Sequence, residues 1–454
     1  MSGADLAFAG LAGAADRIRA KEVSSRELTE LYLERIARLD PVLRAYRVVL
    51  AEEALAAADA ADARTAAGDA PPLNGVPIAI KDDTDVAGQV TMRGSLAHDD
   101  RPAGDAEVVR RLRAAGCVIL GKTHVPELEA MCATESLAFG ATRNPWDPAR
   151  TSGGSSGGSG TAVAAGLAAA ALGTDGAGSI RIPAAACGLF GLKPQRDRLP
   201  MREGWNGLSV TGCLTRGVLD TALFGDAAAG TDWAAAARRS PGRLRIAVSM
   251  KLPRGVFVTV EEEQRAAVRA LAERLRGLGH DVAERDPDYG NAGVRVLARY
   301  LHGVRTEADA MPHPERLSRK TRGLASLGAK LPAALVRRAL AAEEADRART
   351  DAIFEHADVV MTPTLTRRPP LVGEWDDLPA PVMLNGMMGF VAFLGYWNHT
   401  GQPAASVPCE VAPDGFPVGV QLVGRPGDEA TLLSLAAQLE ADSGWTARRP
   451  PLAA

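Results

Sequence analysis

Residues 153–160 read Gly-Gly-Ser-Ser-Gly-Gly-Ser-Gly, and the apolar stretch 162–172 follows after a single threonine. A run of glycine and serine is typical of a flexible linker, but a linker seldom leads directly into core-forming sequence. We predict that residues 162–172 form a buried helix. A second turn of small residues, 173–179, follows it. Both turns therefore belong to the interior of a domain.

The sequence on both sides of these turns predicts alternating helices and strands. A capping box at Ser24 and Glu27 begins a helix that we expect to stop before Pro41. An alanine-rich helix is predicted at 48–67, and a short buried strand at 76–80 ends at Lys81. Further strands are predicted at 117–120, 244–249, 357–362, 404–408 and 418–423, and further helices at 108–115, 261–278 and 429–439. This alternation predicts an α/β fold.

The overall composition excludes several classes of protein. The 52 basic and 55 acidic residues give a net charge of −3, which argues against a nucleic-acid binder with a basic surface. The longest apolar runs are too short for a membrane-spanning helix, and the N-terminus lacks the pattern of a signal peptide. Five cysteines without a C-x-x-C pair predict reduced thiols in a cytoplasmic protein.

Two motifs could suggest other chemistry. Gly153-x-Ser155-x-Gly157 fits a nucleophile elbow, but residues 145–151 cannot form the buried strand that must precede one, and only His399 could serve as its histidine. Residues 116–123 fit the P-loop pattern, yet they include the apolar strand 117–120, which is not a phosphate-binding loop. No His-Glu-x-x-His pattern is present in the sequence, so no metal site is predicted.

Two further signals each allow two interpretations. Lys81, at the end of a buried strand, could extend to the surface or remain buried and act as a base. Residues 173–181 (GTDGAGSIR) could form an ordinary tight turn or a nest of N–H groups that holds an oxyanion beside a nucleophilic serine.

Taken together, these segments resemble the amidase signature family of serine hydrolases. The likeness covers roughly residues 70–240 and 355–440, and the two matching serines, 155 and 179, are 24 residues apart. The segments that carry it are 75–82 (GVPIAIKD), 153–159 (GGSSGGS), 173–181 (GTDGAGSIR), 188–194 (GLFGLKP), 401–408 (GQPAASVP) and 417–426 (PVGVQLVGRP).

The resemblance implies a large central mixed β-sheet flanked by helices on both faces. It divides the single amidase domain, 1–454, into four parts, which are an N-terminal helical region (1–70), a signature core (71–240), a peripheral helical insertion (241–350) and the C-terminal part of the core (351–454).

The resemblance also implies a catalytic triad without metal or cofactor. Ser179 would be the nucleophile, Ser155 the bridging serine after a cis Gly154–Ser155 peptide, and Lys81 the base. The oxyanion hole would be the backbone N–H groups of Gly176, Ala177, Gly178 and Ser179. Ala177 departs from the family, which often has glycine there. If Ala177 needs a positive φ, the alanine costs about 1 kcal/mol.

Substrate choice is expected to depend on two variable segments, 127–139 and 367–399. Within the second, the methionine-rich and aromatic stretch 386–397 could be a core helix or an apolar acyl or aryl pocket. Met131, Phe139 and Trp397 are the candidate pocket residues.

We therefore expect an amidase that cleaves small apolar or aryl carboxamides, with carbamates and esters as extensions. It would be a cytoplasmic monomer or homodimer that acts on a small molecule, without nucleic acid or membrane as partner. The alternative is the glutaminase A-type subunit of a tRNA-dependent amidotransferase. An intact triad argues against a third possibility, a scaffold with a decayed site.

Overall fold

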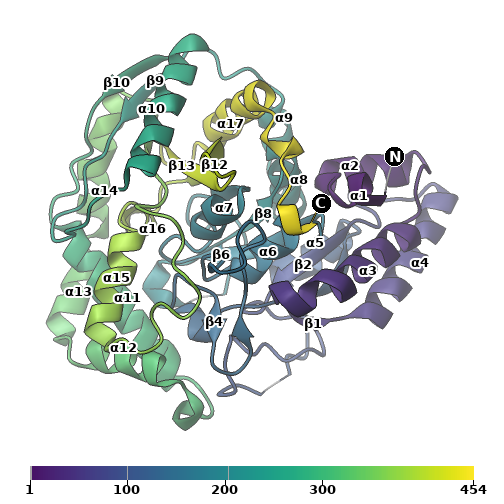
Figure 1. The fold of residues 1–454 in the computed structure, drawn as a ribbon, viewed down its shortest axis with the longest axis horizontal. Helices are drawn as coiled ribbons and strands as arrows, with labels where there is room; N and C mark the ends of the chain where they lie inside the picture. The colour runs from purple at the N-terminus through teal and green to yellow at the C-terminus, as the bar shows by residue number, and fades with distance from the viewer. Residues whose placement is uncertain (1–2, 100, 203, 454) are drawn as a thin grey trace.

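Eleven strands form one mixed sheet through the middle of the molecule (Figure 1). The computed structural model describes residues 3–99, 101–202 and 204–453. The strand order is β1-β3-β2-β6-β8-β7-β12-β13-β11-β9-β10. The strands are β1 Tyr46–Val49, β2 Pro77–Lys81, β3 Val118–Thr123, β6 Ala170–Asp175, β7 Phe190–Lys193, β8 Val210–Thr215, β9 Arg245–Val248, β10 Asp281–Glu284, β11 Val359–Pro363, β12 Ala404–Val411 and β13 Pro417–Gly424. A separate small hairpin consists of β4 Glu135–Ser136 and β5 Gly140–Ala141.

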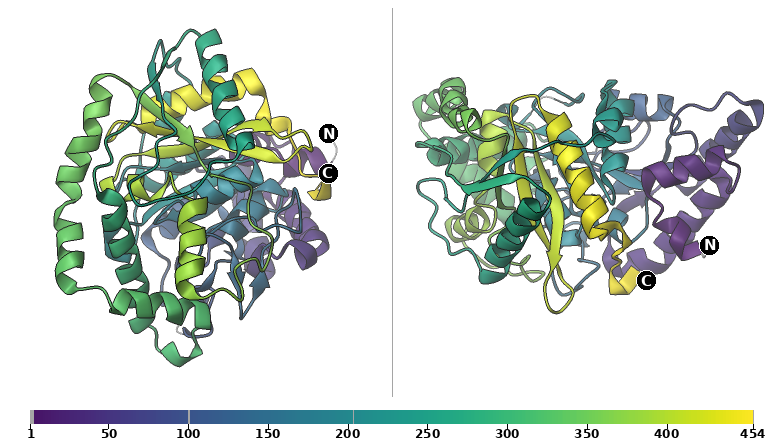
Figure 2. Two further views of the ribbon diagram at one scale, coloured as in Figure 1. Left: turned by 60° about the vertical axis from the view of Figure 1, so that its left-hand side comes forward. Right: turned by 90° about the horizontal axis from the view of Figure 1, so that it is seen from above.

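Helices surround this sheet (Figures 1 and 2). The N-terminal helices lie at one end of the molecule and α11–α14 at the other. The helices are α1 Gly3–Ala7, α2 Gly10–Arg19, α3 Ser25–Leu43, α4 Ala51–Ala67, α5 Glu107–Ala114, α6 Gly157–Ala164, α7 Arg181–Cys187, α8 Val218–Ala229, α9 Trp233–Ala237, α10 Glu262–Gly277, α11 Ala292–Asp309, α12 Arg319–Ala329, α13 Ala333–Ala341, α14 Glu343–Asp351, α15 Ala380–Phe390, α16 Gly395–Thr400 and α17 Glu429–Ser443.

The two faces of the sheet are both covered, as predicted. A Cβ on Gly419 of β13 would meet Ala185 of α7, whereas a Cβ on Gly424 of the same strand would meet Leu432 of α17. Because residues an odd number apart on a strand point to opposite faces, α7 and α17 pack on opposite sides of β13. The six predicted strands all occur as β2, β3, β9, β11, β12 and β13.

Two predictions at the N-terminal end were wrong in detail. The first helix does not stop before Pro41 but continues to Leu43. A proline in the last turn forfeits one helical hydrogen bond, and burial of the fully covered Leu43 offsets that loss. Residues 46–49, which include part of the alanine-rich segment predicted as helix from 48, instead form edge strand β1 beside β3.

The predicted helix 162–172 was wrong beyond Ala164. Helix α6 ends at Ala164, Gly166 takes a positive φ of 64°, and Ala170 begins strand β6. An unbroken apolar run carries no periodicity that separates a buried helix from a buried strand. The consequence matters for function, because β6 then leads directly into the turn at 176–179.

The segment 241–350 contributes more than helices. Its strands β9 and β10 run parallel to each other at one edge of the main sheet, beside β11. Its helix α11 packs against α12, α13 and the short helical turn at Trp205–Gly207. This segment therefore extends the sheet and builds a wall beside it.

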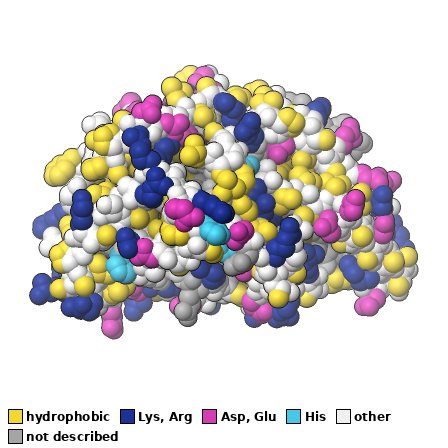
Figure 3. Space-filling model, turned by 90° about the horizontal axis from the view of Figure 1, so that it is seen from below, with side chains coloured by type: hydrophobic (Ala, Val, Ile, Leu, Met, Phe, Trp, Pro, Cys, Tyr) yellow, Lys and Arg dark blue, Asp and Glu magenta, His cyan; other side chains and the backbone are white. Residues whose placement is uncertain are grey.

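The surface carries both signs of charge. On the face in Figure 3, basic, acidic and apolar side chains are interspersed. None of the helices in the described ranges is long and apolar enough to cross a membrane. All five cysteines are buried.

The first prediction concerns Gly158 in α6. A Cβ there would lie 2.5 Å from the Ala45 carbonyl oxygen and 2.5 Å from the His124 backbone nitrogen. Backbone cannot move aside cheaply, so Gly158→Ala should destabilise the fold by about 1–3 kcal/mol or more, measured as a lower thermal midpoint. Gly277→Ala is the control, because a Cβ there would meet no atom of the described residues within 4 Å. Equal midpoints for the two variants would contradict this account.

Candidate active site

Lys81 is the last residue of β2, and its side chain is completely buried. β2 lies between β3 and β6, so the lysine projects from an interior strand of the sheet rather than from an edge strand. Its Nζ donates to Ser155 Oγ at 2.8 Å and to Thr174 Oγ1 at 2.6 Å. It also lies 3.2 Å from Asp83 Oδ2. The interpretation of Lys81 as a surface-reaching side chain is therefore wrong.

Ser155 follows a cis peptide bond with Gly154, as expected. Thr134 stabilises the turn that contains Ser155, because its hydroxyl donates to the Gly153 carbonyl at 2.9 Å. There is no room for a side chain at Gly154, where a Cβ would lie 2.9 Å from the Met131 carbonyl oxygen. The glycines thus allow close packing that places the Ser155 hydroxyl against Lys81.

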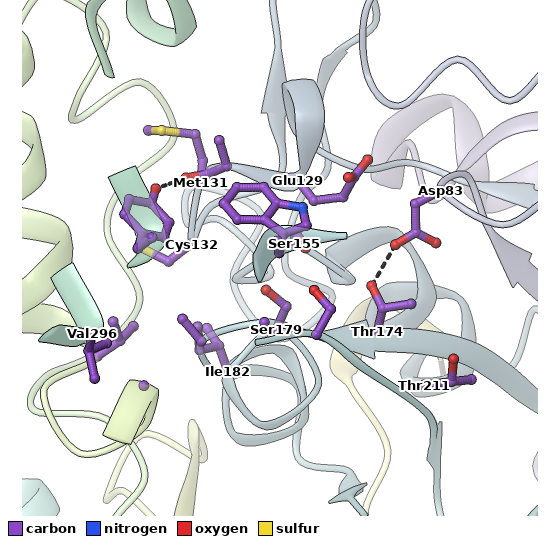
Figure 4. A pocket seen from close by; sticks show the side chains of 18 of the residues that line it. Asp83, Glu129, Met131, Cys132, Ser155, Thr174, Ser179, Ile182, Thr211 and Val296 are labelled. Carbon is purple, nitrogen blue, oxygen red and sulfur yellow. Dashed lines mark hydrogen bonds between the residues drawn. The ribbon is translucent and has the colours of Figure 1, made fainter. Parts of the chain in front are cut away.

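Ser179 lies in the turn between β6 and α7 and lines a cavity together with Ser155. The two turns are tied together, since the Ser156 N–H donates to the Ser179 carbonyl at 3.2 Å. Figure 4 shows the two serine side chains next to one another. Within the described residues, the Ser179 hydroxyl forms no hydrogen bond.

The turn before Ser179 is shaped by the carboxylate of Asp175. This carboxylate accepts the Gly178 N–H at 2.6 Å and the Ile180 N–H at 3.2 Å. We expected a free Gly178 N–H in the oxyanion hole, and the structure differs because Asp175 already binds that group. The N–H groups of Gly176, Ala177 and Ser179 have no acceptor within the described residues.

The expected strain at Ala177 is absent. Ala177 is not among the residues with positive φ, whereas Gly178 has a φ of 121°. A Cβ on Gly178 would also meet Leu394 Cδ1 at 2.5 Å. The position in this turn that requires glycine is therefore 178, and alanine at 177 fits without cost.

Asp175 is held by a fully buried ion pair with Arg181. Arg181 Nη2 lies 2.9 Å from Asp175 Oδ1, and the same nitrogen donates to Asn398 Oδ1 at 2.6 Å. Burial opposes ionisation of Asp175, but the Arg181 charge outweighs it and holds the pKa of this carboxyl well below its usual range. Asp175 and Arg181 belong to the quoted segment 173–181, yet we assigned them no role, because their pairing depends on the turn between them.

A second acidic residue near the triad was also missed. Asp83 Oδ2 accepts the Thr174 hydroxyl at 2.5 Å and faces the Lys81 amine. Burial would raise the pKa of Asp83, but the Lys81 charge and the Thr174 hydroxyl outweigh it and lower the pKa. The sequence signal was the acidic pair at 82 and 83 directly after a buried strand. The two acidic residues have different partners. Asp82 forms ion pairs with Lys122, at 2.9 Å, and with Arg47, whereas Asp83 faces Lys81.

The cavity above the serines has a volume of about 550 Å³ and a largely apolar wall. Trp205 and Tyr300 stack on one another with ring centres 5.7 Å apart. Met131 lines the cavity as expected. Helix α15 and the residues after it supply Leu384, Met387, Met388, Val391 and Ala392. Trp205 and Tyr300 could not be selected from the sequence, since both lie outside the recognised motifs.

The other two candidate pocket residues lie elsewhere. Phe139 packs against His124, with ring centres 5.9 Å apart. Trp397 is fully buried in the core and contacts Tyr289 and Tyr396 edge to face. Neither lines the cavity. The stretch 386–397 therefore fits both interpretations, because its residues 387, 388, 391, 392, 395 and 396 line the cavity and Trp397 belongs to the core.

His399, the histidine considered for a nucleophile elbow, is fully buried and hydrogen-bonded to other side chains. His399 Nε2 lies 2.8 Å from Asp346, and Arg299 donates toward its Nδ1 at 3.0 Å. In the described part of the chain, no group of three or more His, Cys, Asp or Glu side chains is arranged to hold a metal ion.

Comparison with known proteins gives a consistent result. The family model described as Amidase matches residues 27–433. The chain is 51% identical over 459 residues to "Putative amidase AmiB2" of Mycobacterium tuberculosis (strain ATCC 25618 / H37Rv), covering 99% of both chains. It is 36% identical to a glutamyl-tRNA(Gln) amidotransferase subunit of Roseiflexus castenholzii (strain DSM 13941 / HLO8), covering 97% of both. The solved structure of a 6-aminohexanoate cyclic dimer hydrolase with substrate has a TM-score of 0.91 and 31% identity, over 99% of this chain and 100% of that one.

The second prediction tests the ion pair beneath the turn. Arg181→Met leaves the Asp175 carboxylate buried without its cation, which should destabilise the fold by about 3–5 kcal/mol. The measurement is the midpoint of guanidinium unfolding. Arg269→Met is the matched control, because Arg269 pairs with Glu262 on the exposed surface, where ion pairs contribute little. A midpoint for Arg181→Met as high as that of the control would rule out this structural role.

Proposed function

The chain belongs to the amidase signature family of enzymes that hydrolyse amide bonds, and on that premise we propose that Ser179 attacks the amide carbon. The observation that carries the proposal is the contact of the buried Lys81 amine with Ser155, 2.8 Å away, beside a Ser179 hydroxyl that opens onto the cavity. A serine is a weak nucleophile unless a neighbouring base removes its proton.

The proton path follows from the order of the three groups. Neutral Lys81 accepts the proton of Ser155, and Ser155 accepts the proton of Ser179 as the new carbon–oxygen bond forms. The proton then returns through Ser155 to the leaving nitrogen, so that an amine rather than an anion departs. Water hydrolyses the acyl group on Ser179 by the same path.

The charge on the carbonyl oxygen needs donors that are in place before the reaction. The N–H groups of Gly176, Ala177 and Ser179 are available for it, while Gly178 is bound to Asp175. Removal of one such donor typically costs about 2.7–4 kcal/mol of transition-state stabilisation. The ion pair of Asp175 with Arg181 keeps this turn rigid, which supports preorganised donors.

The cavity supports small apolar or aryl carboxamides as substrates. Trp205 and Tyr300 offer aromatic surface, and the methionines of α15 offer an adaptable apolar wall. Carbamates and esters are natural extensions, because their carbonyl carbon undergoes the same attack. We also propose a cytoplasmic location and a monomer or homodimer.

The alternative function is the glutaminase subunit of a tRNA-dependent amidotransferase. The relative from Roseiflexus castenholzii carries the name of such a subunit. The apolar wall of the cavity argues against a pocket for the polar glutamine side chain. Release of ammonia from glutamine alone, or only when a partner protein is added, would favour this alternative.

The third prediction is that amide hydrolysis depends on Ser179 and Lys81. Amine release is measured from an acyl nitroanilide, an aryl carbamate, benzamide and glutamine, and labelling with a fluorophosphonate is measured in parallel. Ser179→Ala should lose both amine release and labelling, because the proposed nucleophile is removed. Lys81→Ala should lose nearly all turnover, at least about 1,000-fold.

The outcomes separate the competing functions. Release from the nitroanilide or the carbamate that requires Ser179 supports a stand-alone hydrolase and shows which bond it prefers. More than a few per cent of wild-type turnover in Ser179→Ala would disprove the assigned nucleophile. Wild-type protein that neither reacts with the probe nor hydrolyses any of these compounds would support a decayed site.

The fourth prediction concerns the aromatic wall. Trp205→Ala should lower kcat/KM for anilides of aromatic acids about 3–10-fold more than for acetamide, because aromatic contacts contribute about 0.5–1.5 kcal/mol beyond their buried area. Trp205→Phe is the control and should retain most of the preference. An equal loss for both substrates in Trp205→Ala would show that this side chain does not select aryl groups.

A further inference from the structure

Asp83 lies two residues beyond Lys81, where the chain leaves β2, and its carboxylate faces back toward the Lys81 amine (Figure 4 shows its link to Thr174). We propose that Asp83 is a positioning residue, which rests on the proposed function and deepens it. Asp83 and Thr174 together aim the lone pair of Lys81 at Ser155, and the charge of Asp83 sets the lower pH limit of activity.

The Lys81 amine has contacts with three residues. Ser155 Oγ lies 2.8 Å from Nζ, and Thr174 contributes its Oγ1 at 2.6 Å and its carbonyl oxygen at 3.4 Å. Asp83 Oδ2 lies 3.2 Å from Nζ as its ion-pair partner and 2.5 Å from Thr174 Oγ1. A neutral amine has two N–H bonds and one lone pair. If the hydroxyl and the carbonyl of Thr174 accept the two N–H bonds, the lone pair is left for the Ser155 proton.

Thr174 and Asp83 hold each other in position for this task. The Thr174 hydroxyl donates to Asp83 Oδ2 at 2.5 Å, so its own lone pair is directed to Lys81. The second carboxylate oxygen of Asp83 accepts the Thr84 hydroxyl at 2.9 Å. Both oxygens of Asp83 are therefore fixed, and its orientation does not depend on the substrate.

The other charged groups near Lys81 are engaged with other partners. Asp82 pairs with Lys122 and Arg47, Glu129 with Arg93, and Asp175 with Arg181. Asp85, which also lines the cavity, accepts the Thr91 hydroxyl at 2.7 Å. Within the described residues, Asp83 forms an ion pair with no cation other than Lys81. Its negative charge therefore acts mainly on this amine.

The charge has a definite effect on the pH profile. Protonated Lys81 cannot take the Ser155 proton, and the Asp83 carboxylate attracts a positive charge on the amine from 3.2 Å. Removing the carboxylate charge should let the relay work at lower pH.

The fifth prediction is that Asp83→Asn shifts the acidic limb of kcat/KM to lower pH by about 1 unit or more. The measurement is anilide hydrolysis and fluorophosphonate labelling rate against pH. Asp83→Glu keeps the charge and should keep the wild-type midpoint, with a lower kcat because its carboxylate is displaced. Asp85→Asn is the matched control and should also keep the wild-type midpoint.

The outcomes separate this role from the proposed function. An active wild type whose acidic midpoint does not move in Asp83→Asn would overturn the role of Asp83 alone. A wild type that reacts with neither substrate nor probe would overturn both. If Asp83→Asn does not fold, Thr174→Val tests the same geometry, and it should lower kcat at least about 10-fold with little change in KM. An unchanged kcat in Thr174→Val would overturn the proposal.

Discussion

The buried amine of Lys81 is the constraint around which the site is arranged. A polar group inside a protein costs several kcal/mol unless it is hydrogen-bonded, and this one is fully buried on an interior strand of an eleven-stranded sheet. Its partners come from three separate places, namely the turn at Ser155, the end of β6 at Thr174 and the exit of β2 at Asp83. Satisfying the amine therefore brings together the groups that the reaction needs.

A second buried charge pair gives the neighbouring turn its shape. Asp175 accepts the backbone N–H groups of Gly178 and Ile180, on either side of Ser179, and forms an ion pair with Arg181. Gly176, Ala177 and Ser179, whose N–H groups have no acceptor within the described residues, line the cavity. The two ion pairs have different roles in the proposed scheme, since that of Asp175 with Arg181 stabilises the fold and that of Asp83 with Lys81 acts on the proposed base.

The cavity combines this polar floor with apolar walls from distant parts of the chain. Met131 follows the short helical turn Glu127–Glu129. Trp205 and Tyr300 stack where a short turn contacts α11, and Met387 comes from α15. The segment 241–350, which carries no recognised motif, thus contributes directly to the cavity. Family membership accounts for amide hydrolysis, whereas the substrate class proposed above rests on these walls.

Much of the fold and of the triad could be predicted from sequence, because both depend on local features. Short apolar runs bounded by glycine or proline placed six strands, and the segments around Lys81, Ser155 and Ser179 carried a family resemblance. The local signal failed at residues 162–172, where an unbroken apolar run did not reveal the change from helix to strand. Only the tertiary structure decided that the Asp175 carboxylate accepts the Gly178 N–H, that Trp397 lies in the core, and that Asp83 faces Lys81. The physical reason is the same in each case, because the partner of a side chain comes from an element distant in sequence or from a turn whose geometry the sequence does not specify.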